Sequence, residues 1–257
     1  MNSGMDIRLK ILEKRKELIG IKGFAQGTPI PTFRHVPVVH FPKEPALICE
    51  IKRSSPSKGD ISTISDSTAQ AGSYIMGGAN VISVLTETSF FKGSLIDLIN
   101  IKTKYPQTAV LRKDFLYSIE DIEISYRAGA DIVLLIASIL EEKEIFQMYK
   151  RTKELGMEAL VEVHDKEDIK KVESFKPQLV GINSRDLRTF TIDLILPLKI
   201  KQDIHWNPVL IFESGIRQAE DVFFALSSGF AGILVGESVV RNISLVSELK
   251  GAMGMGV

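Results

Sequence analysis

Eight short runs of apolar, often β-branched residues recur along the chain, and this repetition is the feature that most limits its possible folds. The runs occupy residues 46–51, 80–85, 109–112, 131–136, 158–163, 179–182, 209–212 and 232–235, and successive runs start 21 to 34 residues apart. That spacing is what a strand, a helix and two short loops require together. Continuous apolar runs separated by amphipathic segments indicate a parallel sheet covered by helices. Eight units predict a (β/α)₈ TIM barrel, and a doubly wound sheet is the second choice.

The first 45 residues do not follow this repeat. We expect one domain, in which residues 46–257 form the barrel and residues 1–45 an additional N-terminal segment. Residues 6–18 have the pattern of an amphipathic helix, whereas residues 23–45 are rich in Gly, Pro and aromatic residues. The segment could be a strap that closes the bottom of the barrel or a cap over its mouth, and the pattern favours neither.

Composition excludes several classes of partner. Lys plus Arg equals Asp plus Glu, 32 of each, so no net charge attracts nucleic acid or an anionic membrane. Residues 1–22 are charged throughout, unlike a signal peptide or a membrane span. The single cysteine, Cys49, has no partner for an internal disulfide. We therefore expect a cytoplasmic protein that acts as a monomer, without a nucleic-acid or membrane partner.

Charged or amide side chains stand at the ends of five of the runs. They are Glu50, Lys52, Lys113, Glu162, Asn183, Arg185 and Glu213. In a parallel barrel the carboxyl ends of the strands meet at one face, where such barrels carry their active sites. The sequence therefore predicts that these side chains converge on one site.

Strand alternation assigns faces to these residues. Glu50 and Lys52 share the inner face, where they form an ion pair that serves either the substrate or the barrel core, while Cys49 faces the helices. Lys113 also faces inward, and we expect a neighbouring cation such as Lys52 to lower its pKa, which suits a general acid. His164 is expected to be a loop histidine rather than a base. The histidines have no metal-ligand spacing with the cysteine, so no metal is expected.

Two glycine-containing segments end the seventh and eighth runs. Ser214-Gly215 and Gly236-Glu237 occupy the place where barrels bind phosphate through backbone amides. Ser55, in the polar turn that Pro56 helps to fix after the first run, is a candidate for the same anion site. These segments predict a phosphorylated small-molecule substrate.

Taken together, the motifs resemble those of the indole-3-glycerol-phosphate synthase family. The pieces that carry the resemblance are residues 50–59 (EIKRSSPSKG), 85–87 (LTE), 91–94 (FKGS), 111–115 (LRKDF), 160–164 (LVEVH), 181–187 (GINSRDL), 213–216 (ESGI) and 235–238 (VGES). They follow the family order and span about residues 46 to 241. Residues 20–45 match the family poorly.

The resemblance implies a carbon–carbon lyase of tryptophan biosynthesis that needs no cofactor. Its substrate would be 1-(2-carboxyphenylamino)-1-deoxyribulose 5-phosphate, which loses carbon dioxide and water as the indole ring closes. By position, Lys113 would be the general acid and Glu162 the acid/base of the dehydration, and Lys52, held by Glu50, would orient the substrate carboxylate. Asn183 and Arg185 would contact the anthranilate moiety, with Glu213 alongside.

The resemblance also implies two binding surfaces. Phe91, Leu134 and Leu187 would form an apolar slot for the aryl ring. The phosphate would lie against Ser55, Ser214, Gly215, Gly236 and Glu237, and Pro56 would belong to the same substrate-binding turn as Ser55.

Two alternatives remain open from the sequence. A phosphoribosylanthranilate isomerase would need a cysteine and an aspartate at strand ends, whereas Cys49 lies in mid-strand on the opposite face. A barrel that only binds a phosphorylated ligand would have no use for Lys113 and Glu162, although a sequence cannot demonstrate turnover.

Overall fold

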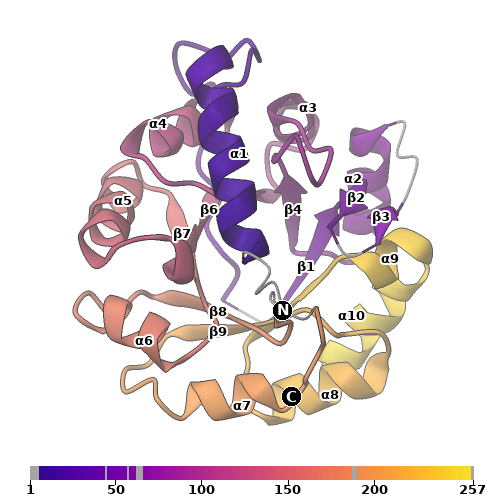
Figure 1. Ribbon diagram of the computed structural model, residues 1–257. Coiled ribbons are helices and arrows are strands. Elements are labelled where there is room, and N and C mark those ends of the chain that lie inside the picture. The colour runs from indigo at the N-terminus through magenta and orange to yellow at the C-terminus, as the bar shows by residue number, and fades with distance from the viewer. Residues whose placement is uncertain (1–5, 44, 57, 62–65, 187–189, 256–257) are drawn as a thin grey trace.

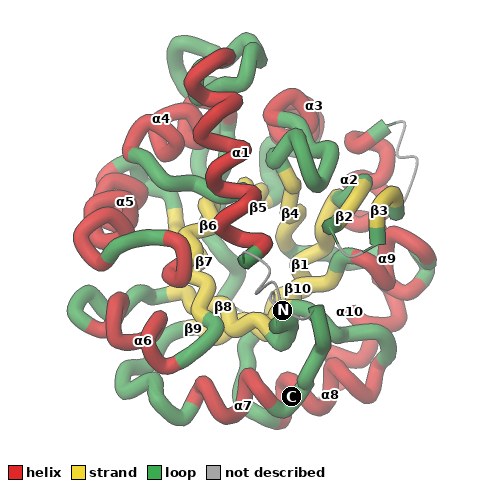
Figure 2. Tube along the Cα trace, in the orientation of Figure 1, coloured by secondary structure: helices red, strands yellow, loops and turns green. Residues whose placement is uncertain are grey.

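The computed structural model describes residues 6–43, 45–56, 58–61, 66–186 and 190–255. Eight parallel strands close into a barrel in the order β1-β10-β9-β8-β7-β6-β5-β4. Helices surround this ring (Figures 1 and 2). The fold is thus the predicted TIM barrel, and the doubly wound sheet is excluded because both edges of the sheet are paired with each other.

The barrel strands coincide with the predicted apolar runs to within one residue. They are β1 (Ala46–Ile51), β4 (Val81–Leu85), β5 (Ala109–Lys113), β6 (Ile132–Ile136), β7 (Glu158–Val163), β8 (Leu179–Asn183), β9 (Val209–Glu213) and β10 (Gly232–Val235). Two further strands, β2 (Ser54–Ser55) and β3 (Gly59–Asp60), form a small antiparallel hairpin in the loop after β1.

Helices follow the strands as the spacing predicts. They are α2 (Ser67–Met76), α3 (Leu95–Lys104), α4 (Ile119–Ala128), α5 (Glu142–Glu154), α6 (Lys166–Glu173), α7 (Leu196–Lys201), α8 (Ala219–Ser227), α9 (Glu237–Arg241) and α10 (Leu245–Met255). A short 3₁₀ helix, η1 (Ala137–Ile139), follows β6. Gly129 ends α4 with a φ of 99°, a left-handed conformation that glycine adopts without strain.

The strand residues divide between two hydrophobic cores. One core lies inside the barrel and includes Ile48, Leu111, Leu160 and Ile211. The other lies between the strands and the helices and includes Cys49. Because successive side chains point to opposite faces, the inner positions continue from these leucines and isoleucines to the polar residues at the strand ends.

The N-terminal segment reaches both ends of the barrel. Helix α1 (Ile7–Lys22) lies at the carboxyl ends of the strands, where Ile11 packs into the inner core and Arg15 bonds to Asp114 just beyond β5. Figure 1 shows it crossing in front of the ring. The helix is therefore a cap at the mouth.

The residues after α1 close the opposite end. Arg34 pairs with Asp131, which directly precedes β6, at 2.6 Å, and the backbone N–H of Val39 donates to the same carboxylate. The N–H of Phe41 donates to Glu158 at the start of β7. Since Val39 and Phe41 also pack against the inner core, this stretch is the strap beneath the barrel. The sequence left open whether the N-terminal segment is a strap below the barrel or a cap over its mouth. The structure shows both, because α1 is the cap and the residues after it are the strap.

Candidate active site

A pocket of about 810 Å³ opens at the carboxyl ends of the strands. It is lined by every predicted site residue that the structure describes, namely Glu50, Lys52, Ser55, Pro56, Phe91, Lys113, Leu134, Glu162, Asn183, Arg185, Glu213, Ser214, Gly215, Gly236 and Glu237. Leu187 lies outside the described residues. The structure thus brings together residues from the carboxyl ends of all eight barrel strands and the loops that follow them.

Sheet register explains why the polar residues form one layer. Glu162 on β7 is the register partner of Gly181 on β8, and Asn183, two residues further on, is the partner of Glu213 on β9. All four are inner-face positions, so their side chains point into the pocket rather than toward the helices. A single glycine in this layer, Gly181, leaves the space that Glu213 fills: a Cβ there would lie 1.9 Å from Glu213 Oε1.

Lys113 is the cation at the centre of this layer. Its Nζ donates to Glu213 Oε2 at 3.0 Å and to Glu162 Oε2 at 3.2 Å. Burial alone would lower the pKa of Lys113, but the two carboxylates outweigh burial and raise it above the ordinary lysine value. The expectation that Lys52 would lower this pKa is therefore wrong. The sequence does not reveal that carboxylates from β7 and β9 face Lys113 across the barrel.

The carboxylate of Glu162 is surrounded by donors and cations. Besides Lys113 at Oε2, it accepts a hydrogen bond at Oε1 from Asn183 Nδ2 at 3.2 Å. Asn183 is held in turn, because its Oδ1 accepts from the backbone N–H of Arg185. Burial alone would raise the pKa of Glu162, but Lys113 and His164 hold it well below its usual range. Glu162 is therefore ionised at neutral pH.

His164 follows β7 directly and lies outside the strand, as the sequence predicts, but its side chain is buried against Glu162. Its Nε2 lies 2.9 Å from Glu162 Oε1, and its side chain is only 9% exposed. Burial alone would lower the pKa of His164, but the carboxylates of Asp168 and Glu162 raise it to about 9. What the sequence does not reveal is the contact of this histidine with the Glu162 carboxylate.

Glu213 has a different environment from Glu162. Lys113 is the only cation paired with it in the described part of the chain, and no described donor reaches its Oε1. Burial, together with the neighbouring charge of Glu162, raises the pKa of Glu213 to about 7. Glu162 and Glu213 are therefore both buried but have opposite tendencies to hold a proton.

Glu50 and Lys52 form the ion pair that the alternation predicts. Lys52 Nζ lies 2.8 Å from Glu50 Oε1 and 5.9 Å from the centre of the Phe91 ring. That ring stacks on Phe115 at 6.3 Å. Both members of the pair line the pocket, so the pair belongs to the site and not to a closed barrel core.

The glycine-containing segments close the other side of the pocket. Ser214 and Gly215 both have left-handed backbones, with φ values of 69° and 85°, which turn the chain sharply after β9. A Cβ at Gly236 would lie 2.8 Å from Glu50 Oε1, so a side chain there would displace the ion pair. Glu237 is paired with Lys58 at 2.8 Å, so its carboxylate is neutralised at the rim.

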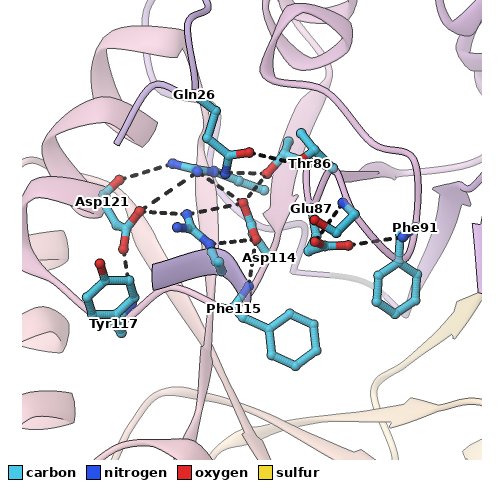
Figure 3. A network of polar contacts seen from close by, with 12 residues as sticks. Gln26, Thr86, Glu87, Phe91, Asp114, Phe115, Tyr117 and Asp121 are labelled. Carbon is cyan, nitrogen blue, oxygen red and sulfur yellow. Dashed lines mark hydrogen bonds and ion pairs between the residues drawn. The ribbon is translucent and has the colours of Figure 1, made fainter. Parts of the chain in front are cut away.

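A buried ion network gathers around Asp114 and Asp121 (Figure 3). Arg15 on α1 donates to Asp114 at 2.9 Å and to Asp121 at 2.7 Å, and Arg112 donates to Asp114 at 3.1 Å. Thr86 also donates to Asp114. All five side chains are fully buried. Nearby, the carboxylate of Glu87 accepts the backbone N–H groups of residues 89–91 and so fixes the loop that carries the Phe91 ring.

Comparison with known proteins identifies the family. The family model described as indole-3-glycerol phosphate synthase matches residues 6–251. The chain belongs to the indole-3-glycerol phosphate synthase family. A protein of that name from Bacillus cereus is 37% identical over 240 residues, covering 93% of this chain and 94% of its own. Another, from Bacillus anthracis, is 36% identical over 235 residues, covering 91% and 92%.

Solved structures of other enzymes share the fold of this family member. A 3-hexulose-6-phosphate synthase from Salmonella typhimurium superimposes with a TM-score of 0.64 at 15% identity, covering 82% of this chain and all of its own. A thiamine phosphate pyrophosphorylase from Pyrococcus furiosus gives 0.58 at 13% identity, covering 83% and 97%. At these identities the likeness concerns the barrel alone.

Two further observations concern classes of ligand and partner. Within the described ranges, no group of three or more His, Cys, Asp or Glu side chains is arranged to hold a metal ion. None of the helices in those ranges is long and apolar enough to span a membrane.

Proposed function

We propose that this chain carries out the reaction of its family with the residues that line the barrel mouth. The substrate, 1-(2-carboxyphenylamino)-1-deoxyribulose 5-phosphate, closes to indole-3-glycerol phosphate with release of one carbon dioxide and one water. A C–C bond forms between the aryl carbon that carries the carboxylate and the ribulose carbonyl carbon. The C–CO₂ bond and then a C–O bond break. No electrons are exchanged with a second reactant, so the chemistry needs proton donors and acceptors only.

The observation that carries this proposal is the ammonium of Lys113 between two buried carboxylates at the pocket floor. The raised pKa of Lys113 keeps it protonated through the neutral range, so it can donate to the carbonyl oxygen as the aryl ring attacks. When Lys113 gives up its proton, the adjacent carboxylates favour its return. Lys113 is thus the general acid of ring closure.

Glu162 is the acid/base of the dehydration. Its low pKa keeps it ionised and ready to take the proton that must leave the ring before water departs. Glu213, which shares Lys113 with it and titrates near 7, lies beside it as a second proton-carrying group.

Three further polar residues orient the substrate. Lys52, held by Glu50, faces the substrate carboxylate and assists proton transfer. Asn183 and Arg185 contact the anthranilate moiety, and the hydrogen bond between the Arg185 N–H and Asn183 Oδ1 keeps the two in fixed relation.

The two ends of the substrate meet different surfaces. Phe91 and Leu134 form an apolar slot for the aryl ring, a role that we also assign to Leu187. The phosphate lies against Ser55, Ser214, Gly215, Gly236 and Glu237, beside the turn that Pro56 fixes. Because Lys58 is paired with Glu237, the backbone amides of this rim are the donors.

The test is a fluorescence assay of purified protein with the carboxyphenylamino-deoxyribulose phosphate, in which the indole product emits. Lys113→Met should lower kcat by about 10²- to 10⁴-fold, the contribution of a general acid. Lys150→Met, at an exposed lysine on α5, is the matched control and should leave kcat unchanged. Near-full turnover by Lys113→Met would show that the acid is misassigned.

A second variant separates chemistry from binding. Glu162→Gln should lower kcat with little change in KM, because the amide keeps the shape of the carboxylate but cannot accept a proton. A large rise in KM with kcat unchanged would make Glu162 a substrate-positioning group instead. Absence of product from the folded wild-type protein would refute the synthase activity and favour a barrel that binds phosphate without this reaction.

A further inference from the structure

The two carboxyl groups that share Lys113 are supported unequally. Glu162 has a second cation, His164, at 2.9 Å from Oε1, and an amide donor from Asn183 at the same oxygen. Glu213 has Lys113 only, and its Oε1 is buried without a described donor. An ionised carboxylate oxygen without a donor is costly in a buried site, whereas a protonated one is not.

His164 lies between the carboxylates of Glu162 and Asp168. Its Nδ1 lies 3.5 Å from Asp168 Oδ2 on α6, and that same oxygen accepts the backbone N–H of His164 at 2.9 Å. Neither ring nitrogen has hydrogen-bond geometry with any described group, so the ring acts on both carboxylates through its charge. The ring does not line the pocket, so it acts on the substrate only through Glu162.

Other charges face His164 from α1 as well as from its own strand and from α6. Asp6, the N-cap of α1, and Arg8, in its first turn, are paired at 2.5 Å and act on His164 with opposite signs. The unbalanced partners of the ring are therefore Glu162 and Asp168. Two anions against one ring favour the imidazolium.

We propose that His164 is a positioning residue whose imidazolium keeps Glu162 as the ionised member of the carboxyl pair and so leaves the shared proton on Glu213. This inference rests on the proposed function, because it names what makes Glu162 the base. Near neutral pH the pair holds one proton, since burial and like charge disfavour two carboxylates beside one lysine. With His164 charged, that proton resides on Glu213, which shares Lys113 with Glu162.

Without the imidazolium of His164, the shared proton no longer prefers Glu213 over Glu162. The proton then spends time on Glu162, which cannot act as a base while it is protonated. His164→Gln keeps a polar side chain but removes the charge. In this variant kcat at pH 6, relative to kcat at pH 8.5, should fall about 3- to 10-fold below the wild-type ratio, as expected if a group titrating near 7 moves onto the base. KM should change little, since the ring does not contact the pocket.

The direct test does not depend on turnover. Carboxyl ¹³C NMR of glutamate-labelled protein, with Glu213→Gln for assignment, should show Glu213 titrating near pH 7 and Glu162 unprotonated down to pH 5. In His164→Gln the titration near 7 should appear on Glu162 as well. His205→Gln, at an exposed histidine between α7 and β9, is the matched control and should leave both signals and the kcat profile as in the wild type.

The wild-type imidazole gives an independent readout should His164→Gln fail to fold. Its ring Cε1–H should titrate near pH 9 and move toward the ordinary histidine value in Glu162→Gln. Titration below 7 in the wild type, or superimposable pH profiles of wild type and His164→Gln, would overturn the proposal. Absence of product from the wild type would refute the synthase activity, while the NMR titrations would still decide the role of His164.

Discussion

The buried guanidinium of Arg15 gives the sharpest test of how α1 is held over the barrel mouth. Arg15 is 1% exposed and is the only residue of α1 paired with the Asp114–Asp121 carboxylates in the described chain. Arg15→Met keeps the length and apolar stem of the side chain but removes the charge. Among the described residues, the two buried carboxylates would then have Arg112 as their one remaining cation, at 3.1 Å from Asp114 and 4.0 Å from Asp121.

The loss of folding stability in Arg15→Met follows from the buried carboxylates that remain without the cation of Arg15. Removing one partner of a buried ion pair costs about 3 to 5 kcal/mol, because the remaining charge keeps its desolvation cost. Since Arg112 still compensates one of the carboxylates, we expect the lower end, about 3 kcal/mol. That is a large share of the roughly 5–15 kcal/mol that stabilises a folded domain.

Two measurements locate the loss. The free energy of unfolding in urea should fall by about 3 kcal/mol, and amide hydrogens of α1 should exchange about 10²-fold faster, since 1.4 kcal/mol is a factor of ten. Lys14→Met is the matched control on the same helix. Its exposed pair with Glu17 contributes roughly 0.2–1 kcal/mol at most. If Arg15→Met lost no more stability than Lys14→Met, the ion network would not be what docks α1.

Two further predictions concern the same layer of the structure. Burial alone would raise the pKa of Asp114, but the two guanidinium groups beside it hold this pKa at about 2. The ionised carboxylate therefore contributes its full stabilisation above pH 4, and this contribution is lost as the pH falls toward 2. The midpoint of urea unfolding should drop between pH 4 and pH 2.5, and it should drop less in Asp114→Asn. Gly181→Ala should lower kcat at least tenfold while the barrel stays folded, because the new Cβ meets the carboxylate end of Glu213. Gly251→Ala is the control and should leave kcat unchanged, because the space around Gly251 is open. Equal kcat values in the two variants would contradict the packing argument.

Strand positions and site membership were predictable because they depend on local alternation. In β7 and β9, apolar residues alternate with neighbours on the opposite face until Glu162 and Glu213 take the last inner positions. Barrel closure then brings equivalent positions into one layer whatever lies between them. The family resemblance supplied the reaction, which no periodicity contains.

Electrostatic environment was not predictable, because its partners are distant in the sequence. Lys113 is 100 residues from Glu213 and 49 from Glu162, so the direction of its pKa shift depends on contacts that only closure creates. The same holds for α1, whose Arg15 is 99 residues from Asp114. The composition of residues 23–45 likewise predicts irregular structure without indicating that part of it lies beneath the barrel.

The end of β5 connects helix α1, which caps the barrel mouth, to the proton donor Lys113. Arg112 and Asp114 point outward into the buried ion network, while Lys113 between them points inward at the carboxyl pair. Because neighbouring strand residues face opposite sides, fixing the outer pair fixes the backbone that carries the ammonium. The 3.0 Å contact of Lys113 with Glu213 thus depends on a network whose guanidinium groups, those of Arg15 and Arg112, do not line the pocket. It follows that Arg15, on a helix outside the barrel repeat, constrains the geometry of the proton donor through the strand itself. If Arg15 constrains Lys113 in this way, Arg15→Met should lower kcat while the barrel stays folded.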